Sequence, residues 1–517
     1  MLGRGVVVVA AIIAVTLTGL GPALATAAQV GGAPAAVHRA NACARVHGDR
    51  QHQQCLASLM PRSYSMMAMG VPDLGGGAPM KRPTTSLASL HGPTGTPAHS
   101  FSLVAAMGEQ VIDGGPRAVM TFNGATPGPT LTVTQGDLVE VALTNQDIAR
   151  GVTIHWHGVD VPGAEDGVAG VTQNAVLPGE THIYRFVVPD AGTYWYHSHQ
   201  DAVDQVAQGL LGALVVLPRP DPAAASLATE DKVAVIHTYG TSTTINGLTG
   251  SQFVAVPVGT TMRARFVNAD NGPALITASA PFRVAAIDGT DVPGATDLQD
   301  TYVLVPAGGR ADLLVTVGEP VRIGMLSGPS WVLAPSDPGP LPELGAHAQF
   351  DALSYGQPGT GAQAAAEFGP PQRRFTYRIG QTTGFLDGQQ DEWFTINSRL
   401  IPYVPMFVVH LGDVVSVEID NETNLPHPMH LHGHHALVVS RNGVPSTGAP
   451  WIVDSLQVAA HERYVLTFVA DNPGIWMWHC HNLPHARSGL MTHLMYDTVR
   501  EPYLVGRVSA GLTNRPE

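Results

Sequence analysis

The sequence predicts an all-β protein built from three β-sandwich domains, and three observations support this fold class. The chain has 517 residues, enough for about three domains of ordinary size. It contains 57 glycines and 41 prolines, residues that break helices and favour turns. Short runs between them alternate Val, Leu and Thr with polar residues, a pattern that predicts strands rather than helical bundles.

Residues 1–27 are predicted to be an export signal. Arg4 precedes an apolar run from Val6 to about Leu20, and Ala23-Leu24-Ala25 supplies the small residues of a cleavage site. The run of about fifteen residues is short for a membrane span, so an uncleaved anchor is the weaker alternative. Arg4 has no second arginine beside it, which favours the general secretory route. The mature protein is therefore expected to be secreted, in the periplasm or the extracellular cell envelope, with no stable membrane span.

Residues 28–100 are expected to form a partly flexible extension, with helical structure around Ala40 to Leu59. Cys43 and Cys55 are expected to pair as a local disulfide in an oxidising compartment, with two free thiols as the alternative. Thioethers bind cuprous ion, so the methionines that follow allow a copper-gathering interpretation. A flexible lead-in with incidental methionines is favoured. These methionines are Met60, Met66, Met67, Met69 and Met80.

Three strand-rich blocks follow, at residues 101–222, 223–366 and 367–517. Gly136-Asp137 in the first block and Gly412-Asp413 in the third each precede an alternating strand that leads to a histidine motif. This weak internal similarity is consistent with repeated sandwich units.

The joints between the blocks are rich in turn-forming residues. Asp221 to Ala225, with Pro220 and Pro222, is predicted to be a linker. Gly339 to Ala366 is predicted to be a loose connector. The middle block between them shows strand patterns but no ligand motif.

The segment His479-Cys480-His481, with His485 four residues later, carries the strongest functional signal. Successive side chains of an extended strand point to opposite faces. Cys480 is therefore expected to face one way, while His479 and His481 face the other. One short strand can then hold a metal on each of its sides, an arrangement that suits an electron relay.

Three further His-x-His pairs lie upstream in strand-like runs. Random placement of 23 histidines in 517 residues would give about one such pair. Both imidazoles of a pair project from the same strand face, as a shared metal cluster requires. The upstream pairs are His155 with His157, His197 with His199, and His430 with His432, the last preceded by His427.

These motifs resemble those of the multicopper oxidases, the family of laccases, bilirubin oxidases and bacterial cuprous oxidases. The resemblance extends from about Phe101 to about Tyr503, and all eleven ligand positions match. It implies three cupredoxin-like Greek-key β-sandwiches and four copper ions per chain. His155 and His430 would bind the type 2 copper, and His427, Cys480 and His485 the type 1 copper. The two type 3 coppers would be held by His157, His197, His199, His432, His479 and His481.

The donor types agree with this division. Two imidazoles and a thiolate are the blue-copper ligand pattern, suited to one-electron transfer. Eight imidazoles around three metals leave room for dioxygen. Reduction of dioxygen to water takes four electrons, whereas a phenol or a metal ion gives one at a time. The cluster's imidazoles come from both ends of the sequence, so the first and third blocks are expected to meet there.

Two positions depart from the family pattern. The residue ten after the cysteine is often an axial methionine, but here it is Leu490, followed by Met491. We favour Leu490 beside the copper, because neighbouring residues of a strand face opposite sides. Ala486 stands where many bacterial relatives carry a glutamate that assists proton delivery. Asp166 matches the other acidic position with that role, and an ordinary loop acid is the alternative.

The sequence therefore predicts an exported multicopper oxidase whose substrate donates electrons near His485. The donor is either a phenol or aromatic amine or a low-valent metal ion, chiefly Cu(I), and dioxygen is the acceptor. The alternative is a non-enzymatic copper-binding or cell-envelope scaffold on the same fold. The formal net charge of −14 argues against a nucleic-acid partner.

Overall fold

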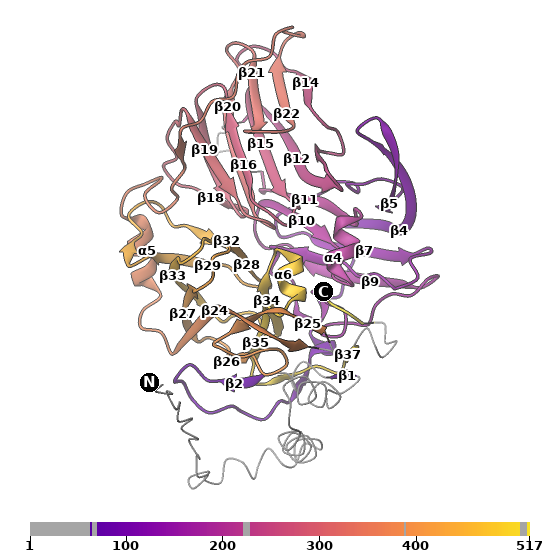
Figure 1. Cartoon of the computed structure of the whole chain (residues 1–517), viewed down its shortest axis with the longest axis vertical. Helices are drawn as coiled ribbons and strands as arrows, with labels where there is room; N and C mark the ends of the chain where they lie inside the picture. The colour runs from indigo at the N-terminus through magenta and orange to yellow at the C-terminus, as the bar shows by residue number, and fades with distance from the viewer. Residues whose placement is uncertain (1–62, 65–69, 221–227, 387–388, 507–513) are drawn as a thin grey trace, which may run out of the picture. The chain divides into compact units, whose positions relative to one another are not determined.

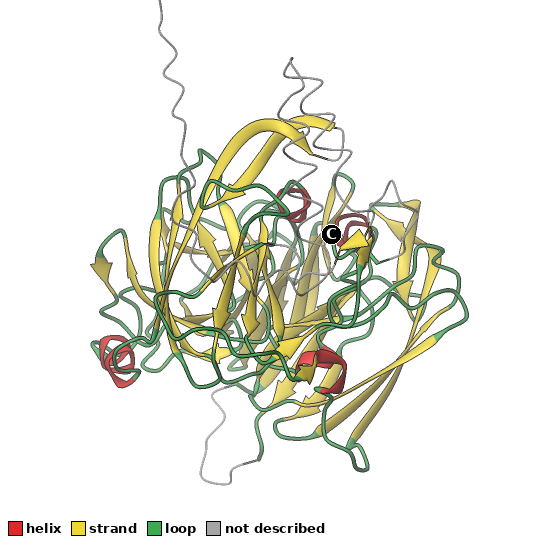
Figure 2. Ribbon diagram, turned by 90° about the horizontal axis from the view of Figure 1, so that it is seen from below, coloured by secondary structure: helices red, strands yellow, loops and turns green. Residues whose placement is uncertain are grey.

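The computed structural model describes residues 63–64, 70–220, 228–386, 389–506 and 514–517. Strands dominate this part of the chain, and its helices are few and short (Figure 2). No helix among these residues has the length and apolar character needed to cross a membrane. The predicted signal peptide, the helix around Ala40 to Leu59, the Cys43–Cys55 disulfide and the linker at Asp221 to Ala225 lie outside the described residues, as do Met60, Met66, Met67 and Met69.

The first sandwich contains two four-stranded sheets that share one apolar core (Figure 1, indigo to magenta). The first sheet, in the order β5-β4-β7-β9, consists of β5 (Gly115–Phe122), β4 (His99–Ile112), β7 (Leu138–Asn145) and β9 (Thr181–Val187). The second, in the order β6-β11-β10-β8, consists of β6 (Leu131–Thr134), β11 (Leu211–Leu217), β10 (Gly192–His197) and β8 (His155–His157). Two short helices accompany them, η3 (Gly163–Glu165) and α4 (Ala202–Ala207).

The middle sandwich pairs two six-stranded sheets around a second core (Figure 1, pink). One sheet consists of β13 (Ser242–Ile245), β12 (Glu230–Tyr239), β15 (Thr261–Asn268), β20 (Arg310–Thr316), β17 (Phe282–Ile287) and β18 (Thr290–Asp291). The other consists of β14 (Ser251–Ala255), β22 (Ser330–Ala334), β21 (Val321–Met325), β16 (Ala274–Ala278), β19 (Thr301–Val305) and β23 (Ala348–Gln349). Helix α5 (Thr360–Glu367) follows, so the expected loose connector contains a helix.

The third sandwich carries the His-Cys-His segment (Figure 1, orange to yellow). Its first sheet consists of β2 (Val71–Asp73), β26 (Pro405–Val409), β35 (Met491–Tyr496), β34 (Ile475–Cys480), β28 (His427–Leu431) and β32 (Ser455–Val458). Its second consists of β25 (Gln389–Ile396), β24 (Arg373–Leu386), β27 (Val414–Asn421), β33 (Arg463–Val469), β29 (Ala436–Arg441) and β30 (Val444–Pro445), with β31 (Ile452–Val453) beside β29. Helix α6 (Leu483–Arg487) leaves the end of β34.

Part of the predicted extension is built into the third sandwich. Strand β2 adds to the edge of the sheet by parallel pairing with β26. β3 (Thr85–Ser86), followed by η2 (Leu87–Ser89), pairs with β36 (Val499–Arg500), and β1 (Ser63–Tyr64) pairs with β37 (Val505–Gly506). No strand signal marks this part of the sequence, because these strands are short and their partners lie more than 300 residues away.

The two Gly-Asp turns support the internal similarity seen in the sequence. Gly136 and Gly412 both adopt positive φ angles, of 78° and 87°, which glycine reaches without steric cost. Each turn leads into a strand, β7 or β27, whose residues alternate strictly between buried and partly exposed. Such alternation places every second side chain in the core. The all-β sandwich fold class is thus confirmed, while the boundaries at residues 222 and 366 stay predictions.

Candidate copper centre

Strand β34 organises the site because each of its two faces contributes to a different group of metal-binding side chains. It pairs antiparallel with β28, with Met429 opposite Cys480 and His430 opposite His479. Residues opposite each other on paired strands share a face of the sheet. His430 therefore joins His479 on one face, and His427, two residues before Met429, joins Cys480 on the other.

The Cys480 face assembles a three-residue group. The Sγ atom lies 3.8 Å from Nδ1 of His427 and 3.8 Å from Nδ1 of His485, and the two Nδ1 atoms are 3.2 Å apart. His427 comes from β28 and His485 from α6. The ring of Phe394 packs against both imidazoles, with centroid distances of 4.9 and 4.8 Å. Three donor atoms this close, from one thiol and two imidazoles, match the donor set of a blue-copper site.

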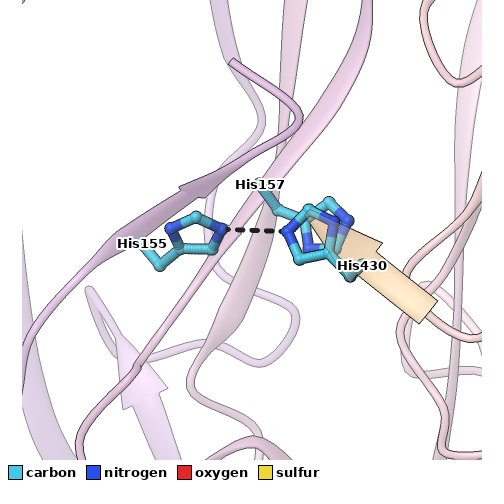
Figure 3. Close-up of side chains that lie close together, drawn as sticks. All are labelled: His155, His157 and His430. Atoms are coloured by element: carbon cyan, nitrogen blue, oxygen red, sulfur yellow. Dashed lines mark hydrogen bonds between the residues drawn. The ribbon is translucent and has the colours of Figure 1, made fainter. Parts of the chain in front are cut away.

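The opposite face assembles the other eight histidines. Each is at most 1 % exposed. Nε2 of His155 lies 3.4 Å from Nε2 of His430, and the rings of His157 and His430 stack at 3.7 Å (Figure 3). The histidines of the first and third sandwiches therefore meet, as expected from the sequence.

The eight imidazoles divide into groups by the distances between their nitrogens. Two sets of three that share no member each have their donor atoms within 4.8 Å of one another: His157, His197 and His481 in one, and His199, His432 and His479 in the other. A third set, His155, His157 and His430, shares His157 with the first. His155 and His430 meet beside them. The members of the pairs at 197/199, 430/432 and 479/481 enter different sets, so each of these three segments spans two neighbouring sets.

The hydrogen bonds leave lone pairs directed into the cluster. Three of the imidazoles place Nδ1 against a backbone carbonyl at 2.9–3.0 Å. The pairs are His155 with Asp166, His197 with Ser198, and His199 with Pro516. A carbonyl only accepts, so these Nδ1 atoms carry the proton and Nε2 keeps its lone pair. In His157 the two nitrogens exchange roles: Nε2 lies 3.0 Å from Ser455 Oγ, and Nδ1 has no partner. Nε2 of His197, His199 and His481 also lacks a hydrogen-bond partner.

Burial sets the protonation state of these groups. It lowers the pKa of six histidines well below the usual value, and the pKa of His427 to about 3; the six are His157, His197, His199, His432, His479 and His481. Neutral imidazoles are the form that binds metal. Burial also raises the pKa of the Cys480 thiol, which disfavours a thiolate unless a cation lies beside it. Buried, unpartnered nitrogens and a buried thiol thus fit bound copper.

Asp166 bridges two of the clustered histidines. Its carboxylate lies 3.0 Å from Nδ1 of His432 and 3.1 Å from Nδ1 of His155, and its side chain is 1 % exposed. A carboxylate behind a metal-binding histidine fixes the ring and its tautomer. This contact explains why an acid stands at position 166; the proton-relay role stays a prediction.

Asp454 was not singled out in the sequence, yet it contacts three histidines. Its carboxylate lies 3.2 Å from Nε2 of His157, 3.4 Å from Nδ1 of His430 and 3.4 Å from Nε2 of His435. Burial opposes ionisation of this acid, but the Arg310 guanidinium, bonded to it at 2.7 Å, holds its pKa well below the usual range. Arg310 belongs to β20 of the middle sandwich. The sandwich without ligand motifs thus supports the cluster through an ion pair.

The strand register decides between Leu490 and Met491. Met491 pairs with His479, whose ring belongs to the histidine cluster. The next position along the two strands brings Leu490 opposite Cys480, and the Cys480 N–H donates to the Leu490 carbonyl at 3.0 Å. Both Leu490 and Ala486 are fully buried. The register therefore favours Leu490 on the Cys480 side, in agreement with the expectation from alternation.

Three of the four other histidines near the motifs make polar contacts, and the fourth is buried. His434 bonds the Tyr496 hydroxyl at 2.8 Å, and His435 lies against Asp160 and Asp454. His461 bonds Asn424, and His493 is buried. None of these four belongs to the donor groups found among the described residues.

Comparisons with known proteins agree with this geometry. Residues 105–221 and 374–499 match two models of the family described as multicopper oxidase. The chain is 27 % identical to multicopper oxidase MmcO of Mycobacterium tuberculosis, over 74 % of this chain and 84 % of that protein. It is 26 % identical to Laccase-2 of Fomitopsis schrenkii, over 71 % and 84 %. A multi-copper oxidase structure from Pseudomonas thermotolerans aligns with a TM-score of 0.61 and 26 % identity, covering 78 % of this chain and all of that one.

Fold and site together define a copper-dependent oxidoreductase built from cupredoxin-like sandwiches. The chain belongs to the multicopper oxidases, which bind type 1, type 2 and type 3 copper and use dioxygen to oxidise reducing substrates. It is a laccase-like enzyme of that family. The resemblance read from its motifs is thereby confirmed.

Proposed function

We propose that this protein is an exported laccase-like oxidase that takes single electrons from a phenol or aromatic amine at His485 and reduces dioxygen to water. The proposed entry point for electrons rests on the difference in exposure among the candidate ligands. Ten of the eleven candidate ligands are at most 1 % exposed, and only His485 is partly exposed. A donor outside the protein can therefore touch the ligand set at this imidazole alone.

The proposed ligand assignment follows the two faces of β34. His427, Cys480 and His485 would hold the type 1 copper; His155 and His430 the type 2 copper; and the two sets of three the type 3 pair. Copper, when bound, supplies the one-electron redox chemistry that stores four electrons for one dioxygen. The backbone of residues 479–481 provides the covalent path between the faces, because Cys480 is bonded to a histidine on each side.

The residues around the cluster hold its ligands and handle protons. Asp166 and Asp454 fix four imidazoles through their outer nitrogens. Four protons must reach dioxygen for every two waters formed. Asp166, buried between His155 and His432, is our candidate for passing protons to the cluster.

The surroundings of His485 suit an organic donor better than a metal ion. The Phe394 ring, itself 4 % exposed, packs against the partly exposed imidazole and gives it an apolar border. Thioethers would be the expected ligands of a cuprous substrate. The extension methionines that could provide them lie, except Met80, outside the described residues.

Oxygen consumption by the purified, copper-loaded protein tests the proposal. We expect about four coppers per chain, a strong blue absorption band, and faster oxygen uptake with a bulky phenol than with Cu(I). Faster uptake with Cu(I) would assign the protein to metal-ion oxidation instead. Full copper occupancy without oxygen uptake from either donor would point to the non-enzymatic scaffold.

A further inference from the structure

A short segment outside the ligand motifs reaches the histidine cluster. The carbonyl of Pro516 accepts a hydrogen bond from Nδ1 of His199 at 3.0 Å. The next side chain, Glu517, is 2 % exposed, and its Oε1 lies 3.3 Å from Nδ1 of His479 and 3.9 Å from Nε2 of His199. Both histidines belong to the same set of three. Residues 514–517, here named the cluster segment, thus touch one of the two type 3 positions.

The cluster segment is bound firmly to the loops around it. The side chain of Asn514 accepts from the Ala175 N–H at 2.9 Å, and it donates to the Asn174 side chain at 2.8 Å and to the Leu504 carbonyl at 2.9 Å. It therefore fixes the start of the segment by three hydrogen bonds.

Arg515 continues the attachment through its backbone. Its N–H donates to the Gln200 side chain at 2.8 Å, and its carbonyl accepts from the Asp201 N–H at 2.6 Å. Gln200 and Asp201 directly follow His199 in the chain. The segment and the ligand-bearing loop therefore hold each other in place, beside α4 and α6 where the end of the chain is marked in Figure 1.

The Glu517 carboxyl has no hydrogen-bond partner for either oxygen. A buried acid without a partner is costly, because the carboxyl loses its hydration and gains no hydrogen bond in return. Nε2 of His199, the nearest atom directed into the cluster, is also without a partner. The Glu517 carboxyl and Nε2 of His199 thus both have lone pairs without a partner. A metal cation bound beside them would compensate both groups.

We propose that residues 514–517 are part of the copper centre: the Pro516 carbonyl positions His199, and the Glu517 side chain closes the type 3 pair against small anions. This rests on the proposed ligand assignment. Pro516 fixes the His199 tautomer with Nε2 directed inward. The acid places both bulk and a carboxyl group against His199 and His479, where they would obstruct and repel an anion that approaches this type 3 position.

Azide binding to the copper-loaded protein tests the inference without any turnover. We would titrate azide into the unsubstituted protein and into Glu517→Ala, Glu517→Gln and Asn514→Ala, following the near-ultraviolet bands that azide produces with copper. We expect Glu517→Ala to bind azide about tenfold more tightly, since it loses both bulk and charge. Asn514→Ala, which loses three anchoring hydrogen bonds, should move in the same direction.

Glu517→Gln separates the two contributions. A gain similar to that of Glu517→Ala assigns the closure to charge, and a gain in Glu517→Ala alone assigns it to bulk; both support the inference. Glu501→Ala is the control, because Glu501 is 8 % exposed and follows β36, which pairs with β3 rather than with a ligand-bearing strand. It should bind azide like the unsubstituted protein.

Two further outcomes complete the test. Loss of the type 3 absorption in Asn514→Ala but not in Glu501→Ala would support the positioning role of the Pro516 carbonyl. Azide affinities within twofold of the unsubstituted protein for both Glu517 variants and for Asn514→Ala, at full copper content, would overturn the inference. An unsubstituted protein that binds azide but consumes no oxygen would instead contradict the proposed function.

Discussion

The two faces of β34 differ in how open they are and in what supports them. On the Cys480 face, three ligands lie among apolar side chains, and one of them, His485, reaches the surface. On the His479 face lie eight buried imidazoles, and carboxylates, carbonyls or a hydroxyl hold a nitrogen of each except His481. A site that takes up single electrons needs contact with a donor and little rearrangement. A cluster that reduces oxygen needs a fixed orientation of its ligands and controlled access.

The middle sandwich helps to support the histidines of the His479 face. It supplies none of the donor groups found among the described residues, but its Arg310 holds Asp454, and Asp454 holds His157 and His430. Asp288 strengthens this junction by accepting from the backbone N–H groups of Arg310 and Ser455. The middle sandwich thus supports the His479 face through an ion pair, and it also contacts α6, which carries His485, where the Leu483 N–H donates to the Asn271 side chain at 3.0 Å.

Cys480→Ser should give the largest difference between the effects on the two faces. We expect the blue absorption and the turnover to be abolished, because a hydroxyl is a poor substitute for the thiolate that links donor and cluster. The other three coppers should stay bound, since their ligands lie on the opposite face. Copper content and the visible spectrum check this. Oxidase activity at the level of the unsubstituted protein would contradict the relay.

Asp454→Asn should affect the His479 face alone. Loss of an outer carboxylate that orients metal-binding histidines typically lowers metal affinity or activity by 10- to 100-fold, so we expect about that loss here. The type 2 electron paramagnetic resonance signal should weaken while the blue band persists. Asp312→Asn is the matched control, because Asp312 is equally buried and pairs with Arg263 and Arg265 but touches no candidate ligand.

The copper-free protein should lose stability in mild acid because of the His479 face. Burial lowers the pKa of six of its histidines well below 6.5, so below that pH the unfolded chain binds more protons than the folded one. The free energy of unfolding should therefore fall as the pH decreases from 7 to 5, by at most about 1.4 kcal/mol per pH unit for each histidine. Urea unfolding of copper-free protein at several pH values measures this. A constant free energy over the range would contradict the buried, neutral state of these imidazoles.

Leu490→Met should produce the smallest effect, confined to the Cys480 face. A thioether in the axial direction is expected to lower the reduction potential of the blue copper. We expect a decrease of about 59 mV, which is a tenfold change in a one-electron equilibrium. Redox titration of the blue band measures the potential, and Met491→Leu is the control. An unchanged potential in Leu490→Met would mean that another residue occupies the axial direction.

Most of the fold class and the ligand candidates could be predicted from local sequence. Strand alternation places His155 with His157, and His479 with His481, on shared faces whatever the rest of the chain does. The extension strand β2 and the helix α5 inside the expected connector could not be found in this way. β2 is three residues long and is stabilised by pairing with β26, more than 300 residues away, so its own sequence carries little signal.

The sequence by itself determined which side chains can bind metal and that Cys480 and its two histidines face opposite ways, because side-chain direction in a strand is a local property. Only the tertiary structure decided how the eight histidines divide into sets, that Arg310 and Asp454 support them, and that Glu517 lies against His199 and His479. Arg310 and Asp454 lie 144 positions apart in the chain, and Glu517 and His199 lie 318 positions apart, so no local stretch of sequence shows these contacts. Arginine and glutamate occur throughout protein surfaces, so only burial beside the cluster distinguishes these two from the others.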